Sequence, residues 1–174
     1  MDKSKIWRFK KTLSFLSKHC QHSERILDLG TSNDLSKFIK QKGFNIKNTS
    51  GENLDIDFQS VLNPNIDLIT AFEIFEHMLA PFNVLNQIKA SKLIASVPLK
   101  LWFANAYWNE QDDWDKHYHE FEEKQFNFLL QKTGWKIIDS EKWAPKSDFK
   151  FGVRPILRMF TKRYYIVYCE RISS

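Results

Sequence analysis

Residues 25–34 read RILDLGTSND, a short apolar run that ends in a glycine and is followed by small polar residues. Such a run is typical of a parallel strand buried on both faces, because its apolar residues do not alternate with polar ones. A glycine directly after a strand lets the backbone approach a ligand closely. Ligands of open α/β sheets bind at the carboxyl ends of the strands, so we expect a binding site at Gly30.

Around this strand the chain alternates between helix-like and strand-like segments. Apolar residues recur at helical spacing over 5–19, and Asp34 is placed to cap a second helix that ends at Gly43. Pro81 suits the first turn of a helix that reaches about residue 90, and another helix is predicted over 120–132. Further strands are predicted over 44–49, 66–72, 92–97, 135–143 and 164–172.

This alternation predicts a single α/β domain over residues 1–174, with a mostly parallel, doubly wound sheet covered by helices on both faces. No helix is evident between the last two strands. The last strand, 164–172, is therefore expected to run antiparallel after a long basic loop over 144–163. The aromatic and acidic segment 101–119 is expected to be a loop or a short helix that forms a lid or a substrate wall.

The C-terminal part of the chain is strongly basic, although the net charge of the whole chain is only +5. Residues 142–174 contain eight Lys and Arg residues against two acidic ones. This bias indicates either an anionic partner or a solvated basic face, and the sequence leaves both open. If the loop reaches the ligand, Arg154 and Arg158 are expected to contact the anionic group.

No segment is suited to export or to membrane insertion. The basic residues 1–11 are not followed by an apolar run of signal-peptide length, and no stretch approaches the ~20 apolar residues of a membrane span. Cys20 and Cys169 lack the spacing of a metal site, and reduced thiols are favoured over a disulfide. We therefore expect a cytoplasmic protein without a membrane span, and its oligomeric state is left open.

The glycine motif lacks the second and third glycines of a dinucleotide fingerprint, which argues against NAD. Five partial motifs instead resemble, in order and spacing, those of class I S-adenosylmethionine-dependent methyltransferases. They lie at residues 26–30, 66–69, 73–78 with Pro81, 95–98 and 119–135. The resemblance covers about residues 24–143. It implies a Rossmann-like, seven-stranded sheet or a reduced form of it, and S-adenosyl-L-methionine as the cofactor.

The resemblance also implies a set of cofactor-binding residues. Asp28, Gly30 and Thr31 would line the methionine end, although Asp28 is alternatively a partner of a turn or helix. Glu52 would bind the ribose hydroxyls and Asp55 would lie near the adenine amino group. Phe72 and Glu73, at a strand end, would lie beneath the sulfonium, or they would only pack there.

Glu73, Glu76 and His77 would share one face of a helical turn. Some methyltransferases of the ubiquinone pathway, and enzymes that methylate RNA 3′ ends, use such a Glu-x-x-Glu-His motif to bind a metal. The RNA enzymes add a distant histidine, which corresponds to His119. A divalent metal at these four residues is one hypothesis. The favoured one is that no metal binds and that His77 orients a loop or a substrate.

His119 and, less well matched to the family, His117 are candidate general bases for the methyl acceptor. Acidic residues within the aromatic segment 101–119 make nucleic acid a less favoured partner. The predicted function is methyl transfer to an oxygen or nitrogen of a small-molecule or glycan-like acceptor. The alternatives are a metal-dependent RNA 2′-O-methyltransferase and a cofactor-binding module that has lost catalysis.

Overall fold

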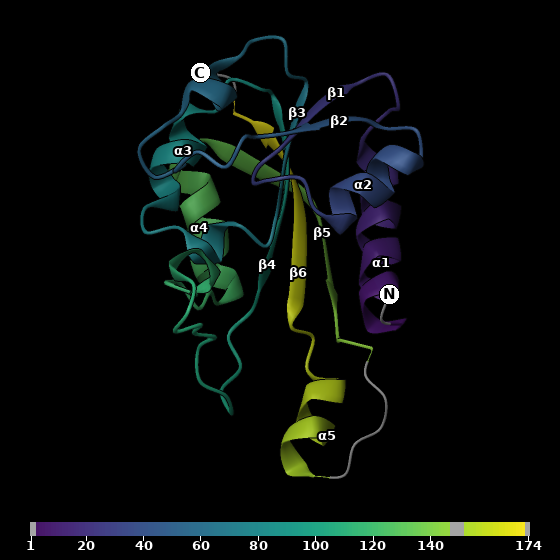
Figure 1. The fold of residues 1–174 in the computed structure, drawn as a ribbon, viewed down its shortest axis with the longest axis vertical. Helices are drawn as coiled ribbons and strands as arrows, with labels where there is room; N and C mark the ends of the chain where they lie inside the picture. Colours follow the sequence, from purple (N-terminus) through teal and green to yellow (C-terminus); the bar gives the residue numbers. More distant parts are fainter. Residues whose placement is uncertain (1–2, 147–151, 173–174) are drawn as a thin grey trace.

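The structure is a computed structural model that describes residues 3–146 and 152–172. Within these residues a six-stranded sheet is covered by helices on both faces (Figure 1). The strands are β1 (Arg25–Asp28), β2 (Asn45–Asn48), β3 (Leu68–Phe72), β4 (Lys92–Pro98), β5 (Trp135–Trp143) and β6 (Tyr164–Arg171). The α-helices are α1 (Lys3–His19), α2 (Asp34–Gln41), α3 (Pro81–Gln87), α4 (Glu123–Lys132) and α5 (Val153–Phe160). Single 3-10 turns are η1 (Gln59–Leu62), η2 (Phe75–His77) and η3 (Asp113–Asp115).

The strand order across the sheet is β2-β1-β3-β4-β6-β5. β1 pairs in parallel with β2 and β3, and β3 pairs in parallel with β4. β6 lies between β4 and β5 and runs antiparallel to both. The predicted mostly parallel sheet with an antiparallel last strand is therefore confirmed. Because the parallel strands point the same way, Gly30 after β1 and Glu73 after β3 meet at one edge of the sheet.

The described residues form the reduced version of the sheet, with six strands in place of seven. Between β2 and β3 the chain forms no helix or strand other than the 3-10 turn η1. A further strand and its crossover helix need about 30 residues, and the segment 49–67 is too short for them. The shortness of this segment thus accounts for the missing strand.

Two apolar layers hold the sheet between its helices. Successive strand residues point to opposite faces, so Ile26 packs with the α1 and α2 side and Leu27 with the α3 and α4 side. Phe15 and Ile39 are fully buried on the first side, and Phe126 is fully buried on the second. Figure 1 shows α1 and α2 on one side of the sheet and α3 and α4 on the other. Both faces of the sheet are therefore packed against helices up to the carboxyl edge where the site forms.

Two local predictions are corrected. Asn33, and not Asp34, is the N-cap of α2, because its side-chain oxygen accepts from the backbone N–H groups of Leu35 and Ser36. The segment 144–163 is not only a loop, since α5 occupies Val153–Phe160 at one end of the molecule (Figure 1). This helix was missed because it is short and has no side-chain N-cap, since the N-cap residue is Gly152.

No helix of the described residues is long and apolar enough to cross a membrane. Cys20 and Cys169 are free, buried thiols. Burial raises the pKa of each thiol to about 12, so neither is reactive at neutral pH.

Candidate functional site

A cavity of about 410 Å³ opens at the carboxyl edge of the sheet. Its wall comes from three loops that follow parallel strands: the Gly30 loop after β1, residues 51–55 after β2, and residues 74–78 after β3. Trp114 closes the remaining side. We refer to this space as the Gly30 cavity. Its size is in the range of ligand pockets, and its position is where doubly wound sheets bind their ligands.

Both the backbone conformation and the space beside Cα require a glycine at position 30. Its φ of 94° lies in the left-handed region, where residues other than glycine are strained. A Cβ on Gly30 would lie 3.0 Å from Cδ1 of Ile74, across the wall of the cavity. The Gly30 N–H donates to Oγ1 of Thr49 at 2.8 Å, which fixes the loop at the end of β1. The predicted lining residues Gly30 and Thr31 both face the cavity.

Asp28 does not line the cavity, because its side chain is buried below the loop and only 3% exposed. One carboxylate oxygen accepts from the Thr70 hydroxyl at 2.7 Å, and the other accepts from the Asn48 amide at 2.9 Å. Burial raises the pKa of Asp28 to about 7, against the effect of these two hydrogen bonds. Since Asn48 also donates to the Gly30 carbonyl at 3.3 Å, Asp28 supports the glycine loop from within.

Glu52 and Asp55 both line the Gly30 cavity, as predicted, but their carboxylates are used differently. Glu52 accepts from the Ser50 N–H at 2.7 Å. Burial alone would raise the pKa of Glu52, but hydrogen bonds from backbone N–H groups outweigh burial and lower it, so the carboxylate is ionised. Both oxygens of Asp55 accept from the backbone N–H groups of Leu79 and Ala80, at 3.0 and 2.7 Å, where α3 begins. Glu52 thus presents an ionised carboxylate at the cavity wall, while Asp55 fixes the start of α3.

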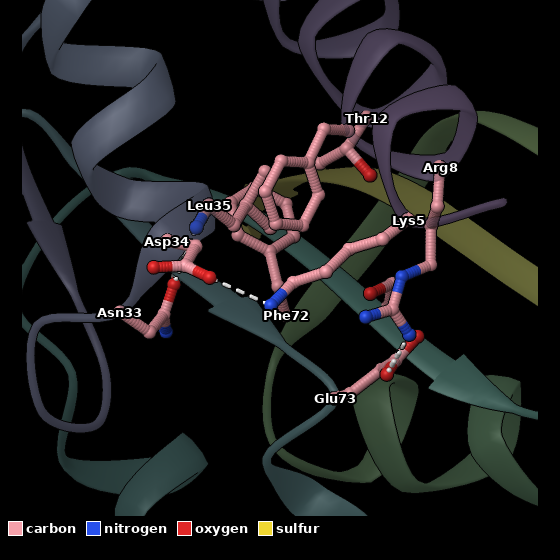
Figure 2. A pocket seen from close by; sticks show the side chains of 10 residues that line it. Lys5, Arg8, Thr12, Asn33, Asp34, Leu35, Phe72 and Glu73 are labelled. Carbon is pink, nitrogen blue, oxygen red and sulfur yellow. Dashed lines mark hydrogen bonds and ion pairs between the residues drawn. The ribbon is translucent and has the colours of Figure 1, made fainter. Parts of the chain in front are cut away.

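Phe72 and Glu73 line a second cavity of about 200 Å³, between α1, α2 and the ends of β3 and β4. Figure 2 shows two ion pairs across it, Arg8 with Glu73 and Lys5 with Asp34, each at 2.6 Å. We call it the Arg8 cavity. Asn33 lines both this cavity and the Gly30 cavity, so the two spaces adjoin at the glycine loop.

Glu73 has a φ of 57° and is the single described residue other than glycine with a positive φ. Strained backbone of this kind persists where surrounding structure enforces it, and it gathers at functional sites. Here the strain turns the chain sharply after β3, so that Glu73 faces the Arg8 cavity while Ile74 faces the Gly30 cavity.

The predicted metal set of Glu73, Glu76, His77 and His119 is not brought together. Glu73 is paired with Arg8, and Nε2 of His119 lies 3.3 Å from the Leu79 carbonyl oxygen. Instead, Glu76, His77 and His117 each place one ligand atom within 4.8 Å of the others. His117 reaches this position because the Glu76 carbonyl accepts from the N–H groups of Tyr118 and His119, at 2.8 and 3.2 Å.

The Glu76 cluster, as we call these three residues, has the donor atoms that a divalent cation such as zinc prefers. Nδ1 of His77 lies 3.1 Å from the Lys116 carbonyl, and Nδ1 of His117 lies 3.2 Å from the Glu120 carboxylate. Both Nδ1 atoms therefore carry the proton, which leaves each Nε2 as the ligand atom. Both oxygens of Glu76 are buried without a hydrogen-bond partner among the described residues.

The candidate bases therefore differ in their surroundings. His119 stacks on Phe121 and anchors a loop through the Leu79 carbonyl. His117 makes an edge contact with His77, whose ring lines the Gly30 cavity, with 4.8 Å between the ring centroids. Burial, followed by the nearby His117, lowers the pKa of His77, so His77 is neutral at physiological pH. His117 thus contacts a residue of the cavity wall, whereas His119 contacts Phe121 and the Leu79 carbonyl.

Sequence reasoning missed several residues of these walls. Asn33, Ile74 and Met78 line the Gly30 cavity, and Lys5 and Arg8 line the Arg8 cavity. Ile74 and Met78 belong to the quoted motif at 73–78, so their position was detectable. Arg8 carried no signal, because nothing in a helical repeat shows which distant strand end it will face.

A family model described as a methyltransferase domain matches residues 4–140. The chain belongs to the methyltransferase-domain family. Together with the solved structures that share its fold, this match confirms the class I methyltransferase fold and the enzyme class predicted from the five motifs, and S-adenosylmethionine as the cofactor. No curated protein sequence matches this methyltransferase significantly.

Solved structures share the fold of this methyltransferase at low identity. A chain of the complex between the Haloferax volcanii Trm112 methyltransferase activator and a methyltransferase is 11% identical with a TM-score of 0.64, over 97% of this chain and 90% of that one. An S-adenosylmethionine dependent methyltransferase from Listeria monocytogenes is 11% identical with a TM-score of 0.60, over 95% and 99%. Phosphoethanolamine N-methyltransferase 2 of Haemonchus contortus, solved with S-adenosyl-L-methionine, is 12% identical with a TM-score of 0.59, over 94% of this chain and 53% of that one.

Proposed function

We propose that this methyltransferase binds S-adenosylmethionine in the Gly30 cavity and methylates an oxygen or nitrogen of a small-molecule or glycan-like acceptor. One observation carries the proposal. The cavity brings a glycine loop at the end of β1 together with an ionised acidic residue, Glu52, from the end of β2. A close backbone approach and a carboxylate acceptor are what a nucleoside with a charged amino-acid tail needs.

Each lining residue then has a role. Gly30 and Thr31 lie along the methionine part, and Glu52 accepts hydrogen bonds from the ribose hydroxyls. Asp55 shapes the adenine side, since its own oxygens are used at the start of α3. Asp28 acts indirectly, by holding the glycine loop. Phe72 and Glu73 form the neighbouring wall, on the side of the sulfonium.

Methyl transfer is a single in-line displacement. The lone pair of the acceptor atom forms the new bond to carbon as the sulfur–carbon bond breaks, and the sulfur leaves as a neutral thioether. The charge on sulfur disappears, so the apolar lining residues Ile74 and Met78, which exclude water beside it, favour the reaction. The proton of the acceptor is taken up by a base, for which we propose His117, with His119 as the alternative.

A second candidate is favoured by the orphaned carboxylate of Glu76. In it a divalent cation is held by Glu76, His77 and His117 and orients an acceptor hydroxyl, as in the RNA alternative. Dependence of methyl transfer on a divalent cation separates this candidate from the first. A module without catalysis would bind cofactor and transfer no methyl group to any acceptor.

Titration calorimetry with S-adenosylhomocysteine tests the proposed function. We expect saturable binding and a rise in melting temperature, because a ligand that binds only the folded state stabilises it. At a hundred times Kd the stabilisation is about 2.7 kcal/mol. The absence of both heat and thermal shift at millimolar ligand would contradict the proposal.

Glu52→Ala is expected to weaken S-adenosylhomocysteine binding by about 1–3 kcal/mol, through the loss of hydrogen bonds to the ribose hydroxyls. Calorimetry measures the change, with Glu110→Ala as the matched control. Glu110 is exposed and does not line the cavity, so its variant should bind as the wild type does. If Glu52→Ala also binds normally, the ribose lies elsewhere.

A further inference from the structure

A third cavity, of about 310 Å³, lies between the segment that follows β4 and two arginines near α5. Arg158 belongs to α5 and Arg163 directly precedes β6. β6 runs antiparallel to β4 with Tyr164 opposite Pro98, so Arg163 lies at the carboxyl end of β4. This Arg163 cavity is therefore at the same edge of the sheet as the Gly30 cavity.

The wall of the Arg163 cavity carries more positive than negative charge. The guanidinium groups of Arg158 and Arg163 have no ion-pair partner within 4.0 Å among residues 3–146 and 152–172. Nε of Arg163 is buried without a hydrogen-bond acceptor in the same residues. A buried guanidinium N–H without an acceptor is costly, which points to an oxyanion that accepts from it. The one acidic residue of the wall, Glu120, already accepts from Nδ1 of His117.

Two aromatic side chains and an amide complete the wall. Tyr107 and Trp108 are 47% and 49% exposed, so their rings present apolar surface to a ligand. Asn105 adds a donor and an acceptor. The cavity thus combines cationic groups for an anion with flat apolar surface for the rest of a molecule.

A thin layer of side chains separates this cavity from the Gly30 cavity. His77 lines the Gly30 cavity, its ring contacts His117, and His117 donates to Glu120, which lines the Arg163 cavity. Arg163 is also close enough to Glu76 to lower the pKa of that carboxyl, although burial raises it more strongly. A molecule in the Arg163 cavity would therefore contact Glu120, which is joined through His117 to His77 in the wall of the Gly30 cavity.

We propose that the Arg163 cavity binds the methyl acceptor by an anionic group, a carboxylate or a phosphate, whose oxygens accept from Arg163 and Arg158. This proposal rests on the proposed function, because it needs the cofactor in the Gly30 cavity. It narrows the acceptor to an anionic molecule with a flat or apolar body. The side chain of Arg154, and Lys150, lie outside the described residues and take no part in the proposal.

Inorganic phosphate and acetate are the probes, each titrated at constant ionic strength into protein saturated with S-adenosylhomocysteine. We expect at least one to bind saturably, and the tighter of the two identifies the anionic group. Arg163→Met is expected to weaken that binding about tenfold or more, and Arg163→Lys less, because lysine keeps the charge without the guanidinium fork. Lys100→Met removes a charge from an exposed neighbour outside the cavity, and it should bind the anion within about twofold of the wild type.

The outcomes separate the two proposals. If the wild type binds S-adenosylhomocysteine but neither anion, or if Arg163→Met binds the anion normally, the acceptor site is wrong. If the wild type binds no S-adenosylhomocysteine, the proposed function itself is wrong. If Arg163→Met does not fold, the variant Arg158→Gln tests the site instead, since Arg158 is exposed. A roughly threefold weaker affinity for the anion supports the site, and an unchanged affinity overturns it.

Discussion

Gly30→Val is expected to lower the affinity for S-adenosylhomocysteine by at least about a hundredfold, equivalent to about 2.8 kcal/mol. Two effects combine. A β-branched residue is strongly disfavoured at a φ of 94°, so the loop must move. Any side chain at this position also meets Ile74, because a Cβ would already lie 3.0 Å from its Cδ1. Titration calorimetry measures the loss of binding.

Gly43→Val is the matched control for this variant. Gly43 has a similar φ of 91°, and its Cβ would meet the ring of His22 at 3.1 Å. It lies at the end of α2 and does not line the Gly30 cavity. We expect Gly43→Val to be destabilised to a comparable extent and to bind S-adenosylhomocysteine normally wherever it is folded. Equal affinities of the two variants would show that Gly30 is not in contact with the cofactor.

The fold was predictable to a large extent because its strands are continuous apolar runs. Residues 66–72 and 92–97 lack polar alternation, and they contain the buried strands β3 and β4, which pair in parallel with each other. Helix starts were less predictable, because two polar residues stand side by side. Asn33 and Asp34 are both suitable N-cap residues. In the structure Asn33 is the N-cap, whereas Asp34 pairs with Lys5, which lies 29 residues upstream in the chain.

The candidate site was predictable only where it is local in sequence. Gly30, Thr31 and Glu52 follow directly from strand ends, and all three line one cavity. Contacts between distant segments carried no comparable signal. His117 and His119 would share one face of a regular strand, because side chains repeat every two residues. The segment is irregular here, and the two histidines face different partners, His77 and the Leu79 carbonyl. Only the hydrogen bonds to the Glu76 carbonyl determine that His117 joins His77.

Glu76 is expected to make the stability of this methyltransferase fall as the pH rises. Its side chain is 1% exposed and both oxygens lack hydrogen-bond partners among the described residues. Burial raises the pKa of Glu76 well above 4.5, and the negative charges of Glu73 and Glu120 add to the effect. The positive charge of Arg163 opposes it less strongly.

The direction of this pH dependence follows from the number of protons that the folded and unfolded states bind. Above pH 4.5 the unfolded chain loses the Glu76 proton while the folded protein keeps it, so unfolding releases a proton and becomes easier with rising pH. The slope is up to about 1.4 kcal/mol per pH unit until the folded carboxyl ionises. Glu76→Gln removes this dependence, because an amide does not titrate in this range.

Urea unfolding of both proteins between pH 5 and 8 is the measurement. The free energy of unfolding of Glu76→Gln should exceed that of the wild type by an amount that grows with pH, and the exposed Glu110→Gln should follow the wild type. Parallel profiles for Glu76→Gln and the wild type would mean that the buried carboxyl is already ionised. Zinc chloride at pH 8 tests whether a bound cation keeps the carboxyl of Glu76 ionised. A cation held by Glu76, His77 and His117 raises the melting temperature of the wild type and not that of Glu76→Gln, because the cation stabilises the ionised carboxylate.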